Sequence, residues 1–286
     1  MSMPSQEQLV TPEPQVAVLL AVHAGAEPAQ FDEALASMRA QTHRNLRLFV
    51  YCDGPVRAAH DEVMVRHLRT EHGVDRVIRG EHPTGLPTGL NCLIDLAIQD
   101  PAIKYMARMD ADDISMPQRI ERQILFLREH AEVTIVGTWC IEFTEPNVPS
   151  FRKRLPSQQA DVAQFMLYRS PLAHPTVMFR RSVFEPGHRY DPRMLIMQDY
   201  ELWSRLMAAG EVISNVPEYL LWFRMAEGFF NRRSGFRRAW GEFRMRFSYA
   251  RRSRMLKPAH IAGLSALFLI RLLPGPLKRW AYTHLR

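Results

Sequence analysis

Three closely spaced carboxylates in the segment Arg108-Met109-Asp110-Ala111-Asp112-Asp113 are the side chains of this chain best suited to chemistry. They follow an apolar run, 103–109, that has the length of a buried strand. Carboxylates this close repel one another unless a cation neutralises them, and an all-oxygen ligand set suits Mg²⁺ or Mn²⁺. Such a cation could hold the diphosphate of a nucleotide-linked substrate. The alternative is a solvated turn, or a cap for the helix that follows.

Strands and helices alternate around this segment. Apolar runs predict buried strands over 16–22, 46–52, 74–79, 103–109 and 133–143. Helices are predicted over 28–39 and 56–72, from the turn at Thr84-Gly85-Leu86 through Ala97, and from Pro117 to Glu129. This alternation predicts an α/β fold, in which a mostly parallel central sheet is covered by helices on both faces. Beyond Pro149 we expect strands over 171–181 and 212–225, with a helix over 199–209 between them.

Polar side chains follow three of the predicted strands. His23, Asp53, and Asp110 with Asp112 each lie where a strand ends. Ligands of parallel sheets bind at the carboxyl ends of the strands. The convergence of these side chains on one sheet edge therefore favours a binding site over an isolated acidic turn.

Charge is distributed unevenly along the 286 residues, whose formal net charge is +7. Residues 232–286 contain 14 of the 37 Lys and Arg residues and only one of the 30 acids, Glu242. An acidic body therefore carries a strongly basic extension. Such asymmetry points to nucleic acid or to an anionic membrane surface as a partner.

Six segments, in order, resemble blocks of the family 2 glycosyltransferases, which have the Rossmann-like GT-A fold. The resemblance extends over roughly residues 15–225. The segments are Val16 to His23, Gln41-Thr42-His43-Arg44-Asn45, Gly85-Leu86 with Leu90-Asn91, the acidic segment through Ile114, His174 to Arg180, and Gln198-Asp199-Tyr200-Glu201-Leu202-Trp203. The acidic segment resembles the DxD motif of the family. Glu27-Pro28 and Asp53-Gly54-Pro55 are most similar to the amylovoran, or exopolysaccharide-biosynthesis, type.

The resemblance implies a role for each matching residue. Asp112 and Asp110 would bind the metal, Mg²⁺ or Mn²⁺, that bridges the diphosphate of a nucleotide-sugar donor. Asp199 would be the general base that deprotonates the acceptor hydroxyl, and single displacement would invert the anomeric centre. The donor would contact Ala21, His23, Asp53, Asn91, Asp110 and Ala111.

Several of these residues have a plainer alternative. Asp199 could cap its helix, and Glu201 is a second candidate for the base. Asn91 could stabilise the Gly85 turn, and His23 could be an ordinary loop residue. His174, before a proline, is more simply read as structural.

Some positions depart from the family pattern. Cys52 replaces the first of two acids that often precede Gly54, which leaves the nucleotide base open. His23 stands where the family loop has an aromatic residue. The Gln-x-x-Arg-Trp block of processive members is absent from the sequence, so we expect transfer of one sugar rather than polymer synthesis.

The basic extension carries its own pattern. Phe236, Trp240, Phe243 and Phe247 recur at helical spacing among arginines. The apolar run 259–273 is shorter than the about 20 residues that a spanning helix needs. We therefore expect a cytoplasmic protein attached peripherally to the anionic inner face of the cell membrane, which suits a saccharide or lipid-linked saccharide acceptor. The alternative is a helix packed on the catalytic domain.

These observations predict three parts: a flexible segment 1–14, a catalytic domain 15–228 and the basic helical extension 229–286. The wide spacing of Cys52, Cys92 and Cys140 argues against disulfides and zinc. Two other functions compete with sugar transfer. A nucleotidyltransferase would usually have a Gly-rich basic loop near 21–30, where this chain has one Gly and no basic residue. A nucleic-acid-binding protein would use the basic extension, but the acidic body opposes it, so we expect no nucleic acid as partner.

Overall fold

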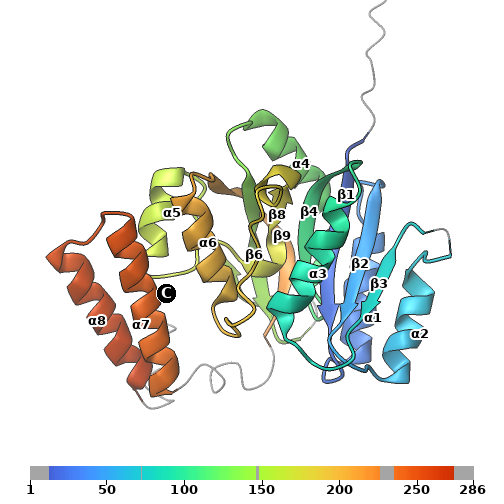
Figure 1. Ribbon diagram of the computed structural model, residues 1–286, viewed down its shortest axis with the longest axis horizontal. Helices are drawn as coiled ribbons and strands as arrows, with labels where there is room; N and C mark the ends of the chain where they lie inside the picture. The colour runs from blue at the N-terminus through green and yellow to red at the C-terminus, as the bar shows by residue number, and fades with distance from the viewer. Residues whose placement is uncertain (1–12, 72, 146–147, 226–234, 274–286) are drawn as a thin grey trace, which may run out of the picture.

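The computed structural model of the chain describes residues 13–71, 73–145, 148–225 and 235–273 (Figure 1). Within these residues, nine strands form one mixed sheet in the order β3-β2-β1-β4-β8-β6-β9-β5, and β7 pairs with β6. The strands are β1 (Gln15–Val22), β2 (Leu46–Cys52), β3 (Arg76–Arg79), β4 (Ile103–Asp110), β5 (Ile114–Ser115), β6 (Ile135–Phe143), β7 (Pro149–Lys153), β8 (Met178–Arg180) and β9 (Ile213–Arg224). The helices are α1 (Pro28–Arg39), α2 (Ala58–His67), α3 (Leu86–Ile98), α4 (Arg119–Glu129), α5 (Gln159–Met166), α6 (Gln198–Ala208), α7 (Phe236–Arg252) and α8 (Pro258–Leu272).

Parallel pairing brings the ends of three strands together. β1 pairs in parallel with both β2 and β4, so Ala21 lies opposite Tyr51 on one side and Asp110 on the other. β2 also pairs in parallel with β3, and β6 with β9. Among the described strands, every antiparallel pair involves β5, β7 or β8: β8 pairs with β4 and β6, β5 with β9, and β7 with β6. The predicted mostly parallel sheet is confirmed, and Ala21, Asp53 and Asp110 lie at its carboxyl edge.

Helices cover both faces of the sheet, as predicted. Alternate residues of a strand point to opposite faces. Val18 and Leu20 therefore join one core cluster with α1, α2 and α4, whereas Ala17 and Leu19 join another with α3, α5 and α6. Because β1 is buried on both faces, its sequence is a continuous apolar run rather than an alternating one.

The basic extension forms a helical hairpin of α7 and α8 at the end of the molecule away from β2, β3 and α2 (Figure 1). One face of α7 packs on the domain. The Tyr249 hydroxyl donates to the Ala163 carbonyl oxygen at 3.1 Å, and Arg252 Nη2 donates to Ser204 Oγ at 2.7 Å. The packing alternative therefore holds for this helix. Phe236, Trp240 and Phe243 instead contact Phe268 of α8.

Most predicted elements match the structure within one or two residues, but three predictions need correction. The second helix spans only Ala58–His67 rather than 56–72. Pro117 lies in a turn before α4, which begins at Arg119. The strand expected over 171–181 is mostly irregular: His174–Thr176 is a 3₁₀ turn, and only Met178–Arg180 pairs as β8. The reason is Pro175, which has no N–H for a sheet ladder.

Sequence patterns missed β5, β7 and α5. Their lengths are short, and each depends on contacts with distant segments. The predicted flexible segment 1–14 lies outside the described residues except for Glu13 and Pro14, and the predicted boundary at 228/229 lies in the undescribed range 226–234.

Candidate active site

The acidic segment forms a tight turn at the carboxyl end of β4. Carboxylate oxygens of Asp110, Asp112 and Asp113 lie within 4.8 Å of one another. Strand β9 holds this turn: the Arg224 backbone N–H donates to Asp113 Oδ1 at 2.8 Å, and Arg224 Nε donates to the Asp112 carbonyl oxygen at 2.8 Å. The turn is thus fixed from outside its own sequence, and its three carboxylates converge on one point.

Electrostatics make this cluster suited to a divalent cation. Burial, followed by repulsion from Asp110, raises the pKa of Asp112. Burial and repulsion from both neighbours raise the pKa of Asp113 well above its usual value. Asp113 Oδ2 is buried and has no hydrogen-bond partner among the described residues. Among the residues that the structure describes, one cation, Arg108, forms an ion pair with this cluster, through Asp110. Closely spaced carboxylate oxygens that repel one another are suited to bind Mg²⁺ or Mn²⁺.

Gln41, in the Gln-Thr-x-x-Asn segment, holds the chain that follows the acids. Its side chain is buried, and Nε2 donates to Ser115 Oγ at 3.1 Å and to the Met116 carbonyl oxygen at 2.9 Å. Its Oε1 accepts from the Ile120 N–H at 3.1 Å. This segment therefore positions the acidic turn and the start of α4 rather than contacting a ligand.

Asp53 and Gly85 tie the end of β2 to the start of α3. Asp53 Oδ1 accepts from the Thr84 N–H at 2.6 Å, and both its oxygens lie 3.1 Å from the Gly85 nitrogen, which donates. Gly85 has a φ of 91°, a left-handed conformation that favours glycine. His23, by contrast, is exposed, and its Nδ1 accepts from the Gly25 N–H at 3.0 Å. Asp53 and His23 both lie at the carboxyl edge of the sheet, as predicted.

Asn91 uses its amide to hold the loop before α6. Nδ2 donates to the Tyr190 carbonyl oxygen and Oδ1 accepts from the Tyr190 N–H, each at 2.9 Å. The Tyr190 hydroxyl in turn hydrogen-bonds His174 Nε2 at 2.8 Å. The structure thus gives Asn91 a positioning role that differs from its alternative at the Gly85 turn, and the donor contact stays a prediction.

Asp199 lies in the first turn of α6. The N-cap of this helix is Met197, so Asp199 is not the cap. Met197 adopts a left-handed conformation, with a φ of 57°, which is unusual for a residue other than glycine and is a form of strain found at functional sites. Glu201, the second candidate for the base, is paired with Arg205 at 3.0 Å. Asp199, and not Glu201, lines a large cavity with Asp110.

That cavity has a volume of about 840 Å³ and lies between the carboxyl edge of the sheet, α6 and the α7–α8 hairpin. It brings together residues that the sequence placed far apart. Two of its features had no predicted role: Arg108, which is 3% exposed, and the part of the lining that the hairpin contributes. Its carboxylates and size suit a sugar-containing substrate.

His174 supplies a test of this arrangement. Burial, together with the nearby charge of Arg108, holds the pKa of His174 well below its usual value. Below about pH 6.5 the unfolded chain binds a proton that the folded protein excludes, so stability is lost as the pH falls. For each pH unit below about 6.5, we expect His174 to lower the free energy of unfolding by up to ~1.4 kcal/mol.

Urea unfolding of the wild type and His174→Gln at pH 7.5, 6.0 and 5.0 measures this effect. Glutamine can keep the hydrogen bond to the Tyr190 hydroxyl without titrating. The wild type should lose more stability than the variant on acidification. Parallel pH curves for the two proteins would contradict the prediction.

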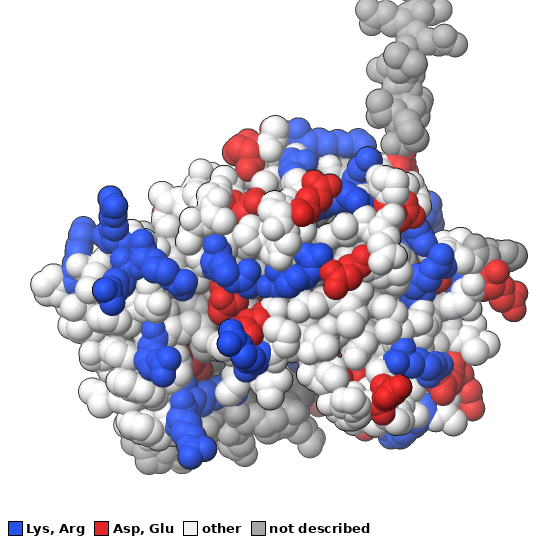
Figure 2. All heavy atoms as spheres, viewed as in Figure 1, with Lys and Arg blue, Asp and Glu red and all other residues white. Residues whose placement is uncertain are grey.

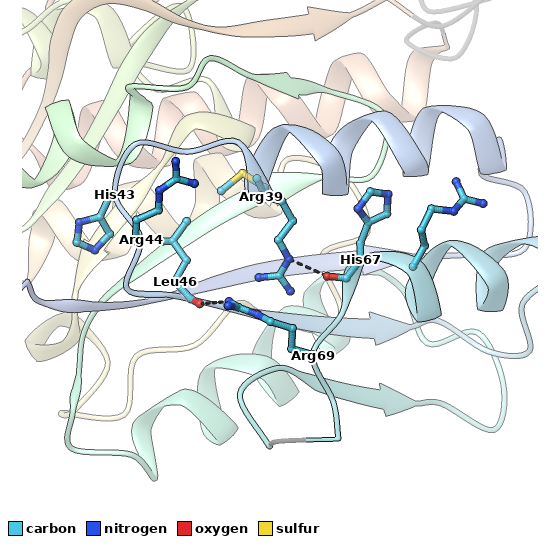
Figure 3. Close-up of a pocket in the computed structure, with 8 residues that line it drawn as sticks. Arg39, His43, Arg44, Leu46, His67 and Arg69 are labelled. Atoms are coloured by element: carbon cyan, nitrogen blue, oxygen red, sulfur yellow. Dashed lines mark hydrogen bonds between the residues drawn. The ribbon is translucent and has the colours of Figure 1, made fainter.

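A smaller cavity of about 280 Å³ lies at the amino end of β2 (Figure 3). Basic side chains surround it, but protein groups engage several of them. Arg39 donates to the His67 carbonyl oxygen and pairs with Asp75, and Arg69 donates to the Leu46 carbonyl oxygen. These contacts tie α1, α2 and β2 together, so we assign the functional site to the other edge of the sheet.

Comparison with solved structures first defines the class of protein to which this fold belongs. A solved mannosyltransferase of Pyrobaculum calidifontis, in complex with GDP-Man and Mn²⁺, superposes with a TM-score of 0.60 at 15% identity, over 90% of this chain and 70% of the other. The fold is therefore that of the GT-A glycosyltransferases.

The sequence then gives the family. Residues 22–187 match the profile of Glycosyl transferase family 2. The amylovoran biosynthesis glycosyltransferase AmsE of Erwinia amylovora is 29% identical over 93% of this chain and 97% of its own length. The UDP-Gal:alpha-D-GlcNAc-diphosphoundecaprenol beta-1,3-galactosyltransferase of Escherichia coli is 26% identical over 94% and 95%. The chain belongs to glycosyltransferase family 2, which confirms the resemblance drawn from its motifs.

Proposed function

We propose that this glycosyltransferase is inverting, metal-dependent and non-processive, and that it moves one sugar from a nucleotide-sugar donor to a hydroxyl of a saccharide acceptor. The observation that carries the proposal is the cavity in which Asp110, from the convergent acidic cluster, and Asp199 line the same space. One carboxylate group is suited to hold a metal and the other to accept a proton. A nucleotidyltransferase has no need of the second.

Asp112 and Asp110 are the proposed metal ligands. Asp113 contributes to the cluster, but its Oδ1 already accepts from the Arg224 N–H. When bound, Mg²⁺ or Mn²⁺ supplies positive charge that stabilises the leaving nucleoside diphosphate. Ala21, beside Asp110 in the sheet, together with Ala111, His23 and Asp53, is proposed to contact the donor.

Asp199 is the proposed general base. It lies in the first turn of α6 and lines the large cavity. As the acceptor oxygen bonds to C1 of the donor sugar, the bond from C1 to the diphosphate breaks and the hydroxyl proton passes to the Asp199 carboxylate. Attack from the face opposite the leaving group inverts the anomeric centre, so no covalent intermediate is needed.

The acceptor is proposed to be lipid-linked, in the biosynthesis of a bacterial surface or extracellular polysaccharide. The names of the two relatives support this: one is an amylovoran biosynthesis glycosyltransferase and the other acts on a diphosphoundecaprenol-linked sugar. We propose a cytoplasmic location, peripheral on the inner face of the membrane, with no nucleic acid as partner.

Donor hydrolysis by the purified protein tests the proposal. UDP-, GDP- and dTDP-sugars are incubated with Mn²⁺, Mg²⁺ or EDTA, and released nucleoside diphosphate is measured. We expect slow release from one donor that EDTA abolishes. Thermal unfolding with each nucleoside diphosphate plus metal adds a binding readout. The absence of both release and stabilisation with every nucleotide tested would contradict the proposal.

Membrane attachment is proposed through the α7–α8 hairpin. None of the helices that the structure describes is long and apolar enough to span a bilayer. The hairpin nevertheless exposes large apolar side chains, with Phe236 62%, Trp240 45% and Leu269 61% exposed. Basic side chains gather over this end of the molecule (Figure 2). Exposed aromatic groups beside arginines suit the headgroup region of an anionic membrane.

Replacing Phe236 and Trp240 together by Ser is expected to weaken binding to phosphatidylglycerol-containing vesicles by ~10-fold or more, because each aromatic ring buries apolar area in the interface. Co-sedimentation measures the effect. The double variant Val65→Ser with Leu125→Ser removes apolar groups that are 83% and 40% exposed on α2 and α4, and should bind as the wild type does. Equal binding of both double variants would contradict attachment through the hairpin.

A further inference from the structure

The C-terminal hairpin contributes to the lining of the large cavity. Arg238 and Arg246 of α7 and Arg271 of α8 line it together with the apolar Leu267 and Ile270. Asp110 and Asp199 line the same cavity. The basic extension therefore builds part of the substrate cavity.

All three arginines lie near a single carboxylate, that of Glu242. Arg238 Nε lies 3.5 Å from Glu242 Oε1, while Arg246 Nη2 and Arg271 Nε lie 3.8 and 3.1 Å from Glu242 Oε2. We call Arg238, Arg246 and Arg271 the hairpin arginines. Arg246 and Arg271 thus approach the same oxygen of Glu242, and burial strengthens the repulsion between guanidinium groups this close.

Arg246 is the most constrained of the three. Its side chain is 6% exposed, and Nε and Nη1 have no hydrogen-bond partner among the described residues. Arg271 Nε and Glu242 Oε2 likewise make no hydrogen bond there, despite their ion pair. A buried guanidinium with unused donors destabilises a protein unless an anion completes its hydrogen bonds. The unused donors of Arg246 and Arg271 fit an anionic ligand.

The position of Arg246 relates this part of the cavity lining to the reaction. Its guanidinium carbon lies 5.6 Å from the centre of the Tyr200 ring, which follows Asp199 in the chain. The Tyr200 hydroxyl donates to the Met166 carbonyl oxygen at 2.7 Å, so the ring is fixed. Helix α6 thus carries both Asp199 and the ring against which Arg246 packs.

We propose that the hairpin arginines bind the diphosphate of a lipid-diphosphate acceptor, with Leu267 and Ile270 against the first part of the lipid chain. The inference rests on the proposed function and specifies its acceptor. A sugar diphosphate linked to a lipid is an anion whose oxygens can accept from the unused N–H donors of the buried Arg246. Guanidinium groups bind phosphate oxygens through paired hydrogen bonds. The donor diphosphate belongs instead to the acidic cluster.

Decyl diphosphate, which lacks a sugar, is a suitable probe. We expect calorimetry to show that it binds the wild type, and that Arg246→Gln and Arg271→Gln each weaken its binding ~10-fold or more. Arg244→Gln is the matched control, because Arg244 is exposed on the same helix and does not line the cavity. Since Arg271 is 24% exposed at its side chain, its variant should fold even if the Arg246 variant does not.

Three results would overturn the subsite. These are wild-type binding that the Arg271 variant retains in full, an equal loss in Arg244→Gln, and displacement of decyl diphosphate by a nucleoside diphosphate with Mn²⁺. The last would place both diphosphates at one site. Failure of every nucleoside diphosphate to bind with metal, while decyl diphosphate still binds, would instead contradict the proposed function and leave the subsite standing.

Discussion

Replacing Asp199 by Asn should lower the rate of sugar transfer by about 10²–10⁴-fold, the usual contribution of a positioned general base. The change removes the proton acceptor but keeps the size of the side chain in the first turn of α6. Donor binding should persist, because the proposed donor contacts lie on other elements. We therefore expect the loss in kcat rather than in the affinity for nucleoside diphosphate with Mn²⁺, measured by transfer assays and calorimetry.

Glu201→Gln is the matched control for this prediction. It makes the same carboxylate-to-amide change on the same helix, at a residue that pairs with Arg205 and does not line the cavity. Its transfer rate should stay close to that of the wild type. A large loss in Glu201→Gln with near-normal activity of Asp199→Asn would reverse the assignment and make Glu201 the base.

Replacing Asp112 by Asn should abolish metal-dependent donor binding and lower transfer by ~10³-fold or more, because a bound metal contributes several kcal/mol to stabilising the leaving charge. The variant should be no less stable than the wild type without metal, since it removes one of three mutually repelling carboxylates. This combination separates a lost ligand from a damaged fold.

Thermal unfolding with nucleoside diphosphate and increasing Mn²⁺ measures the effect. The wild type should be stabilised progressively, because a ligand that binds only the folded state raises its stability, and Asp112→Asn should not respond. Asp95→Asn is the control, as this exposed carboxylate on α3 pairs with Arg189 away from the cluster. A wild type whose donor binding ignores EDTA would show that the acids do not hold a required metal.

The sequence predicted the elements whose signals are local. Continuous apolar runs located β1, β2 and β4, because each strand is buried on both faces and shows this in its own residues. Helix α1 was predicted with its observed bounds, since Pro28 begins it. Strand β8 was overestimated because a three-residue strand exists only through its pairing with β4 and β6.

The site divides in the same way. Asp110, Asp112 and Asp199 were recognisable because their types and order form motifs, and parallel pairing then brought the strand ends together as expected. The role of Asn91 was not, because its partner Tyr190 lies in a loop that has no periodic signal. The left-handed Met197 likewise has no signature in sequence.

By itself, therefore, the sequence determined the α/β fold, the family and the carboxylates at the sheet edge, because apolar periodicity and short motifs are encoded within a few neighbouring residues. Only the tertiary structure decided that α7 and α8 close the cavity. The hairpin arginines read in sequence as part of a basic, aromatic-rich tail. Their place in the cavity lining, and that of Arg246 beside Tyr200, depends on packing between distant segments, which no local pattern records.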